Sequence, residues 1–279
     1  MPDVLLIDTP LPGVRRLTMN RPEKRNALNN ELRGAIFSAL TESDRDPEIR
    51  VSIIRGAGPS FSAGYDLAAN NAVDQPYYTA QGLLPWSRHV VEGWFRMWDL
   101  AKPVIAQVHG YCLAGGSELA TACDLVYVAE DAQIGYPPTR LMSPPDMQFH
   151  PWLLGMRRAM EMYLTGDAIT GIEAAQDGFA NRAYPADKLD EEVLKIAERV
   201  SKVPADLQQI NKRSVHRAME HMGMRDALRS GADLQSLAFC TESSQAYRAQ
   251  FKRDGGSVRN LLSQRDAPFQ DYRERKPGN

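Results

Sequence analysis

Two short glycine-containing segments carry the residue pattern in this sequence that is best suited to chemistry. Residues 61–67 read FSAGYDL, and small residues next to Gly64 let a backbone approach a ligand closely and point its amides outward. Residues 103–120 read PVIAQVHGYCLAGGSELA, a pattern typical of a strand, a glycine-bearing turn and the start of a helix. The unpaired amides and the positive dipole end of a helix N-terminus favour an anion. Together the segments predict a site where backbone amides hold negative charge.

Nucleotide-binding glycine motifs do not explain these turns. Gly110 and Gly115 have the spacing of a P-loop, but Gly116 stands where that motif requires its phosphate-binding lysine. The segment also lacks the GxGxxG pattern of a dinucleotide-binding fold. The glycines therefore indicate another kind of ligand.

The composition excludes several classes of protein. The net charge of -2 provides no broad basic field for nucleic acid, and no apolar run approaches the roughly 20 residues that span a bilayer. The sequence begins with MPDV, without the basic and apolar regions of a secretory signal. Cys112, Cys123 and Cys240 are scattered and form no metal-binding motif. We expect a cytoplasmic protein with reduced thiols, no metal, no nucleic-acid partner and no membrane contact.

The N-terminal two thirds of the sequence alternate strand and helix patterns. Residues 4–7 and 14–19 predict a hairpin around two prolines and a glycine. Asn29 or Asn30 can cap a helix that ends before Pro47. Further strands are predicted at residues 51–54, 104–108 and 125–128. Strands that alternate with helices are typical of an α/β fold with parallel sheet.

The sequence after Gly155 is mostly helical in pattern. Thr170 and Glu173 form a capping-box pair, and Asp187 is in place to cap the following helix. After Pro204 the pattern predicts one more helical stretch, to about Phe251. We therefore predict an α/β core over residues 1–203 and a helical C-terminal region over residues 204–279.

Four segments in order resemble the signature segments of the crotonase (enoyl-CoA hydratase/isomerase) superfamily. They are residues 20–28 (NRPEKRNAL), residues 61–66 (FSAGYD), residues 108–124 and residues 164–178. The similarity extends over about residues 4–200. The resemblance implies a spiral of ββα units, a helical C-terminal trimerisation region, and an acyl-CoA thioester as substrate. It also implies that the amides of Tyr65 and Gly115 form an oxyanion hole, which stabilises charge on the thioester oxygen.

The resemblance transfers only part of the family's acid–base chemistry. Glu118 matches one of the two glutamates of family hydratases, but Pro138 stands at the position of the second. Asp146 lies where other members of the superfamily carry a working aspartate, so Glu118 and Asp146 are our catalytic candidates. A helix-capping role for Glu118 and a loop role for Asp146 are the alternatives. His150, four residues after Asp146, is a possible partner for it, although Pro151 argues against a regular helix there.

The remaining binding residues also follow from the resemblance. The ligand loop comprises Ala63, Gly64, Asp66 and Leu67, which act through their backbone. Arg25, together with Arg21 and Lys24, lies in the region beside the CoA nucleotide. Coenzyme A is then part of the substrate, and no cofactor is expected. A hydrolase using Asp146 and a non-catalytic acyl-CoA-binding protein remain alternatives, and we expect a homotrimer or hexamer.

Overall fold

A six-stranded sheet forms the centre of the molecule. The computed structural model describes residues 3–69 and 85–269. In this sheet β1 and β2 form an antiparallel hairpin, and β2 continues into parallel pairs as far as β9. The strands in spatial order are β1 (Leu5–Leu11), β2 (Val14–Met19), β3 (Val51–Gly56), β4 (Val104–Val108), β6 (Leu125–Ala129) and β9 (Arg182–Tyr184). The predicted hairpin and parallel sheet are confirmed.

A second, three-stranded sheet contains the strand that leads into α3 (Gly115–Ala122). It pairs β5 (Tyr111–Leu113) in parallel with β7 (Gln133–Gly135), which pairs antiparallel with β8 (Ile169–Thr170). Because β5 ends two residues before α3 begins, this small sheet determines where the N-terminus of α3 points.

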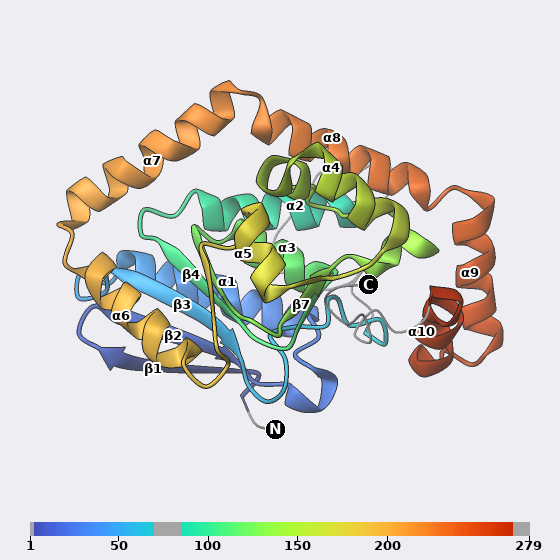
Figure 1. Ribbon diagram of the computed structural model, residues 1–279, viewed down its shortest axis with the longest axis horizontal. Helices are drawn as coiled ribbons and strands as arrows, with labels where there is room; N and C mark the ends of the chain where they lie inside the picture. The colour runs from blue at the N-terminus through green and yellow to red at the C-terminus, as the bar shows by residue number, and fades with distance from the viewer. Residues whose placement is uncertain (1–2, 70–84, 270–279) are drawn as a thin grey trace.

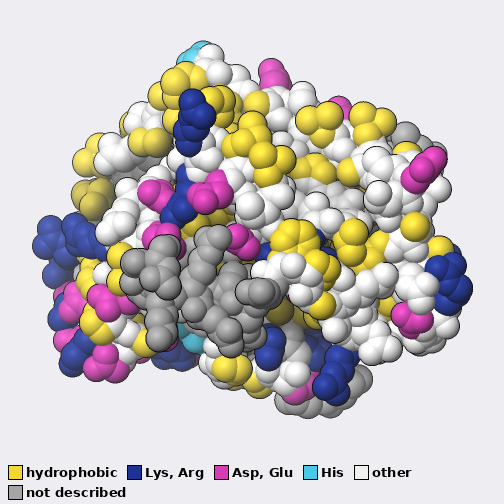
Figure 2. Space-filling model, turned by 45° about the vertical axis from the view of Figure 1, so that its right-hand side comes forward, with side chains coloured by type: hydrophobic (Ala, Val, Ile, Leu, Met, Phe, Trp, Pro, Cys, Tyr) yellow, Lys and Arg dark blue, Asp and Glu magenta, His cyan; other side chains and the backbone are white. Residues whose placement is uncertain are grey.

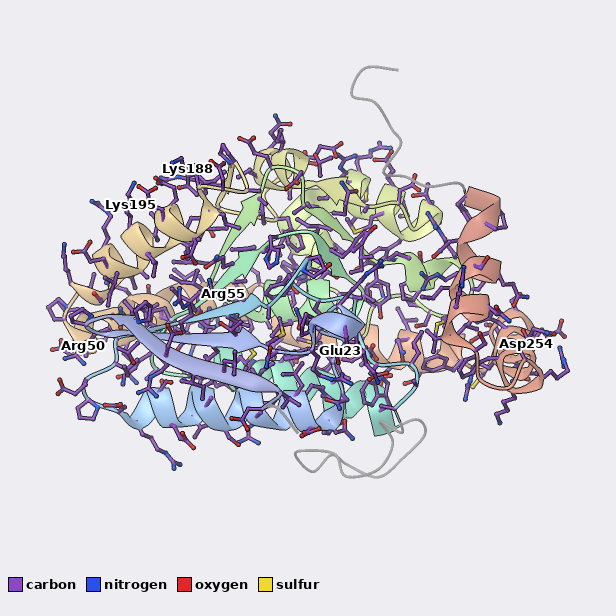
Figure 3. All side chains as sticks on the ribbon, turned by 90° about the horizontal axis from the view of Figure 1, so that it is seen from below. Glu23, Arg50, Arg55, Lys188, Lys195 and Asp254 are labelled. Carbon is purple, nitrogen blue, oxygen red and sulfur yellow. The ribbon has the colours of Figure 1, made fainter. Side chains whose placement is uncertain are left out.

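Helices cover both faces of the large sheet. Figure 3 shows α1 (Asn30–Arg45) on one face and α6 (Leu189–Ser201) on the other. Asn29 caps α1 by accepting from the Leu32 amide at 2.9 Å, and the helix ends before Pro47, as predicted. The other core helices are α2 (Pro85–Trp98), α4 (His150–Thr165) and α5 (Gly171–Asp177). Their apolar side chains and those of the strands form one buried core.

The C-terminal region is predicted as one helical stretch to about Phe251, but the structure divides it into several helices. It contains α7 (Ala205–His221), α8 (Met224–Ala238), α9 (Glu242–Arg253) and α10 (Val258–Asp266). Breaks occur at Gly223 and at Gly255 and Gly256, where positive φ angles suit glycine. In Figure 1, α7 and α8 run along the top of the molecule, and α9 and α10 lie at its right-hand end. α8 packs against α2.

Two further details of the helix ends bear on the predictions. The Thr170–Glu173 capping box is present, as predicted. Asp187 does not cap α6, because Lys188 occupies the N-cap position and no side chain bonds there. The boundary between 1–203 and 204–279 falls between α6 and α7, and the division into two domains stays a prediction. The tail from residue 270 lies outside the described residues. No described helix combines the length and the apolar character needed to cross a bilayer.

Candidate active site

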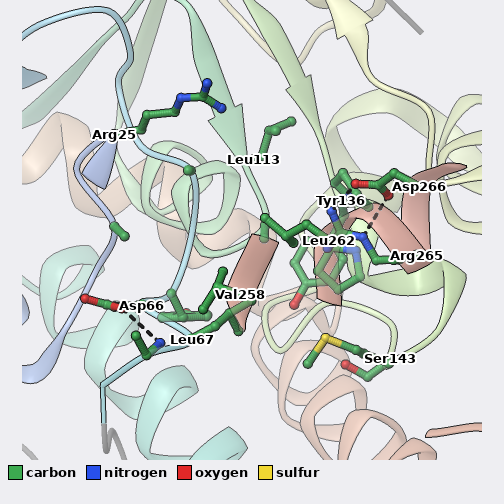
Figure 4. Close-up of a pocket in the computed structure, with 18 of the residues that line it drawn as sticks. Arg25, Asp66, Leu67, Leu113, Tyr136, Ser143, Val258, Leu262, Arg265 and Asp266 are labelled. Atoms are coloured by element: carbon green, nitrogen blue, oxygen red, sulfur yellow. Dashed lines mark hydrogen bonds and ion pairs between the residues drawn. The ribbon is translucent and has the colours of Figure 1, made fainter. Parts of the chain in front are cut away.

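A cavity of about 1120 Å³ lies between the loop after β3, the turn before α3 and the C-terminal helix α10. Figure 4 shows Asp66 and Leu67 on one side of it and Tyr136 and Ser143 on the other. The predicted site residues in its wall are Arg25, Ala63, Tyr65, Asp66, Leu67 and Asp146. Gly64, Gly115 and Glu118 lie directly behind that wall rather than in it. Sequence positions that are far apart therefore meet at one cavity.

The loop that carries Tyr65 is fixed to its neighbours by backbone hydrogen bonds. Leu28 donates its amide to the Gly64 carbonyl at 2.8 Å and accepts from the Asp66 amide at 3.0 Å. These two bonds use the carbonyl of Gly64 and the amide of Asp66, and neither uses the amide of Tyr65 between them. Ser62 is tied to β5 by bonds to the Tyr111 carbonyl and from the Leu113 amide. The loop therefore cannot move independently of the turn before α3.

Gly64 and the start of α3 are in close contact. An ideal Cβ on Gly64 would lie 2.7 Å from the Ala114 Cβ and 3.2 Å from the Gly115 nitrogen. Gly64 also has a φ of +101°, which favours glycine. Gly115 is the first residue of α3, so its amide has no acceptor within the helix. The two predicted oxyanion amides thus belong to segments that touch, as a shared binding point requires.

The backbone at Ala114 is strained. Its φ of 51° and ψ of -125° place it in a region that residues with a Cβ rarely adopt. The Ala114 amide bonds to the Gly135 carbonyl at 2.9 Å, which holds this conformation. Such strain costs about 1–3 kcal/mol and occurs preferentially at functional sites, where the surrounding structure enforces it.

The Glu118 side chain is fully buried and held by three hydrogen bonds. Its Oε1 accepts from the amides of Asp146 at 2.8 Å and Met147 at 3.2 Å, and its Oε2 accepts from the Tyr65 hydroxyl at 2.6 Å. Burial raises the pKa of Glu118, while these bonds oppose the shift because they favour the charged form. The carboxylate is thus rigid, and the phenol of Tyr65 lies between it and the cavity.

Asp146 is a buried carboxyl in the cavity wall. It is only 2% exposed, and its Oδ1 has no hydrogen-bond partner. Burial raises the pKa of Asp146 well above its ordinary value, and the nearby charge of Glu118 raises it further. A buried, unsatisfied oxygen at the wall of a cavity is suited to contact a ligand.

His150 does not face Asp146, so this predicted pairing is wrong. His150 begins α4, and its Nδ1 lies 3.1 Å from the Tyr163 hydroxyl. Burial lowers the pKa of His150 to about 4, which keeps the ring neutral at physiological pH. Because α4 begins only at His150 and no helix runs from Asp146 to it, the i to i+4 relationship never forms.

The predicted basic cluster is divided between two roles. Arg21 is nearly buried, and its Nη2 pairs with Asp66 at 2.8 Å, so it braces the ligand loop instead of facing a phosphate. Arg25 and Lys24 do line the cavity. The guanidinium of Arg25 lies 5.0 Å from the centre of the Tyr111 ring. Asp66 takes part through its side chain, whereas the sequence assigned it only a backbone role.

Several site residues carried no sequence signal. The buried Arg33 of α1 lies over the rings of Trp86 and Tyr65, at 5.0 and 5.8 Å from their centres. Gln235 of α8 reaches the cavity from the C-terminal region and bonds to Ser87. Their spacing matches ordinary helix faces, so only the tertiary contacts identify them. Residues 3–69 and 85–269 contain no group of three His, Cys, Asp or Glu side chains placed to hold a metal ion.

Comparison with known proteins places this chain in a family. Residues 11–258 match the model of the enoyl-CoA hydratase/isomerase family. The chain is 33% identical over 238 residues to a "Probable enoyl-CoA hydratase" of Mycobacterium bovis, covering 84% of this chain and 90% of that protein. It is 30% identical over 259 residues to the mitochondrial enoyl-CoA hydratase of Pongo abelii, covering 91% and 83%.

Solved structures agree with the sequence matches. An enoyl-CoA hydratase/isomerase from Xanthobacter autotrophicus Py2 superposes with a TM-score of 0.85 at 35% identity, covering 96% of this chain and 99% of that one. An enoyl-CoA hydratase from Mycobacterium smegmatis has a TM-score of 0.86 at 28% identity, covering 96% and 95%. The fold is therefore the crotonase fold with a helical C-terminal region. The chain belongs to the enoyl-CoA hydratase/isomerase family of the crotonase superfamily.

Proposed function

We propose that this protein is a hydratase or isomerase of acyl-CoA thioesters that stabilises an enolate with the amides of Tyr65 and Gly115. The observation that carries the proposal is the contact between Gly64 and Gly115, which brings an unpaired loop amide to a helix N-terminus beside a cavity. Removing the α-proton of a thioester places negative charge on its carbonyl oxygen. Two fixed N–H donors stabilise that charge without reorganising.

The two carboxyls divide the proton transfers between them. Glu118 accepts three hydrogen bonds that favour its ionised form, so it is the base. Asp146 has a raised pKa and an unpartnered oxygen at the cavity wall, so it is the group that delivers or holds a proton beside the acyl chain. Burial raises the pKa of both carboxyls, and three hydrogen bonds to Glu118 oppose that rise at Glu118. Pro138 lines the same wall and offers no proton.

The protein is expected to bind acetoacetyl-CoA and to show little affinity for NAD or ATP. Its glycine turns hold an oxyanion, and the lysine or glycine pattern of a nucleotide site is missing. Isothermal titration with the three compounds measures the binding. Turnover of enoyl-CoA and dienoyl-CoA substrates, followed by ultraviolet absorbance, then tests catalysis. Tight NAD binding without CoA-thioester binding contradicts the proposal.

A hydrolase is the second candidate, and the unpartnered Oδ1 of Asp146 favours it because the same oxygen is free to activate water or attack carbon. Product analysis separates the candidates. Free coenzyme A or a covalent acyl adduct on Asp146 supports the hydrolase, whereas a hydrated or double-bond-shifted thioester supports the leading proposal. Binding without turnover of any thioester in the panel identifies an acyl-CoA-binding protein.

We also propose a homotrimer or a dimer of trimers. Of the leucines on α8, Leu228 is buried within the chain, whereas Leu234 and Leu237 are each 57% exposed. Figure 2 shows hydrophobic side chains exposed over the upper part of one face. Other large exposed side chains on α4 and α7 are Met156, Met160, Leu164, Leu207, Ile210 and Val215. Such an apolar surface is typical of a subunit interface.

Sedimentation equilibrium at micromolar concentration is expected to give the mass of three or six chains. Replacing Leu234 and Leu237 by serine should shift the distribution toward monomer, because both side chains are solvent-exposed in the single chain. The matched control is serine at Leu6, which is 46% exposed at the sheet edge in β1. A monomer at every concentration contradicts the assembly.

A further inference from the structure

We infer that the phenolic hydroxyl of Tyr65 is a catalytic group, which relays the substrate's α-proton to Glu118. This inference rests on the proposed function and adds a side-chain role to a residue so far assigned only a backbone amide. In the relay the thioester α-carbon gives its proton to the Tyr65 oxygen as the Tyr65 hydroxyl proton passes to the Glu118 Oε2. The electron pair of the C–H bond moves onto the thioester oxygen, so the products are an enolate, a neutral phenol and a carboxylic acid.

The first observation is that Glu118 does not reach the cavity itself. Its side chain is 0% exposed and is absent from the cavity wall, whereas Tyr65 lines that wall. Both oxygens of the carboxylate are occupied, one by two backbone amides and the other by the Tyr65 hydroxyl. The Tyr65 phenol therefore connects the cavity to the Glu118 carboxylate by one hydrogen bond.

The second observation is the hydrogen-bond inventory of the phenol oxygen. A tyrosine hydroxyl donates one hydrogen bond and accepts two. Tyr65 donates to Glu118 at 2.6 Å and accepts from the Trp94 indole nitrogen at 3.3 Å. One lone pair remains for a proton that arrives from the cavity. The short donor distance is that of a charge-assisted bond to a carboxylate, the arrangement needed for the proton to transfer.

The third observation is that the ring cannot swing away from this position. An ideal Cβ on Gly115 would lie 2.6 Å from the Tyr65 Cε2, so the ring packs directly on the start of α3. The Trp86 and Tyr65 rings pack edge to face, with 5.0 Å between their centroids. The Arg33 guanidinium lies 5.8 Å from the centre of the Tyr65 ring. The Tyr65 ring is thus held between the start of α3, Trp86 and Arg33.

A second phenol must be considered, because Tyr136 also lines the cavity and its hydroxyl interacts with Glu118. The geometry favours Tyr65, since its bond to Oε2 measures 2.6 Å and its ring is the one packed on Gly115. Tyr163 provides a control, because it is a phenol in the field of Glu118 that lies outside the cavity wall and pairs with His150 instead.

The test measures α-proton exchange of butyryl-CoA in D₂O by proton NMR, alongside calorimetric binding of acetoacetyl-CoA. Tyr65→Phe keeps the ring and the amide, so binding should be unchanged while exchange falls by about 10²-fold or more. Glu118→Gln should show a similar loss. The double variant should be no slower than the slower single variant, since groups that act as one unit are not additive. Tyr163→Phe should exchange at the wild-type rate.

Each other outcome has a definite reading. Full exchange by Tyr65→Phe, a multiplicative loss in the double variant, or a loss that appears only in Tyr136→Phe overturns the relay and leaves the proposed function intact. If the wild type binds acetoacetyl-CoA but exchanges no α-proton, the relay is wrong together with the α-proton chemistry. If the wild type binds no CoA thioester, the proposed function itself fails.

Discussion

Replacing Asp146 by asparagine is expected to lower kcat by about 10²–10⁴-fold, the usual contribution of a general acid or base. The carboxyl lines the cavity, is 2% exposed and has an oxygen without a hydrogen-bond partner, so the variant removes a titratable group while keeping its shape. Steady-state kinetics on the best thioester of the enoyl-CoA panel measure the loss. Asp131→Asn is the control, because Asp131 is an exposed acid between β6 and β7.

The same substitution should stabilise the protein, and the effect should grow with pH. Because the folded-state pKa of Asp146 is raised above its ordinary value of 3.8, the folded protein binds this proton more tightly than the unfolded chain. The free energy of unfolding therefore falls as pH rises from near 3.8 through the raised folded-state pKa. Asparagine removes that dependence. Urea unfolding of both proteins at several pH values measures the difference.

A combined result decides the role of Asp146. Lower kcat with equal or greater stability shows that a functional group was lost and that the fold was kept, a common trade-off at active sites. Full kcat in Asp146→Asn means that the acid–base chemistry lies elsewhere. Loss of activity together with loss of stability means that Asp146 supports the structure instead.

Gly64→Ala is expected to lower kcat by about 10²–10³-fold, the effect of losing one oxyanion donor. The new Cβ would lie 2.7 Å from the Ala114 Cβ and 2.9 Å from the Leu113 carbonyl oxygen, so either the loop or the turn before α3 must shift. A shift of either segment separates the amides of Tyr65 and Gly115. The positive φ of +101° adds strain of roughly 1–2 kcal/mol.

Gly223→Ala separates steric displacement from backbone strain. Gly223 has a similar φ of +91°, but nothing lies within 4 Å of an ideal Cβ there. Gly223→Ala should therefore lose the same strain energy as Gly64→Ala, roughly 1–2 kcal/mol of stability. Its kcat should equal that of the wild type. Thermal melting and kinetics on both variants make the comparison. Equal kcat in Gly64→Ala and the wild type contradicts an oxyanion hole at this contact.

Much of the fold was readable from local sequence patterns, because short-range physics determines them. The hairpin of β1 and β2, the Asn29 cap and the Thr170–Glu173 capping box depend on residues close in the chain, and all three are confirmed. The predicted pairing of Asp146 with His150 failed for the opposite reason. It assumed a helical turn at a place where the backbone enters α4 only at His150.

The sequence by itself determined the family, the crotonase α/β fold, and the two glycine segments that flank the site. Only the tertiary structure decided which side chains face the cavity. Glu118 lies behind Tyr65, Asp146 reaches the wall, and Arg21 braces the ligand loop through Asp66. These outcomes depend on contacts between residues tens of positions apart. No local sequence pattern encodes the direction of a buried side chain, so the packing of the whole chain determines such contacts.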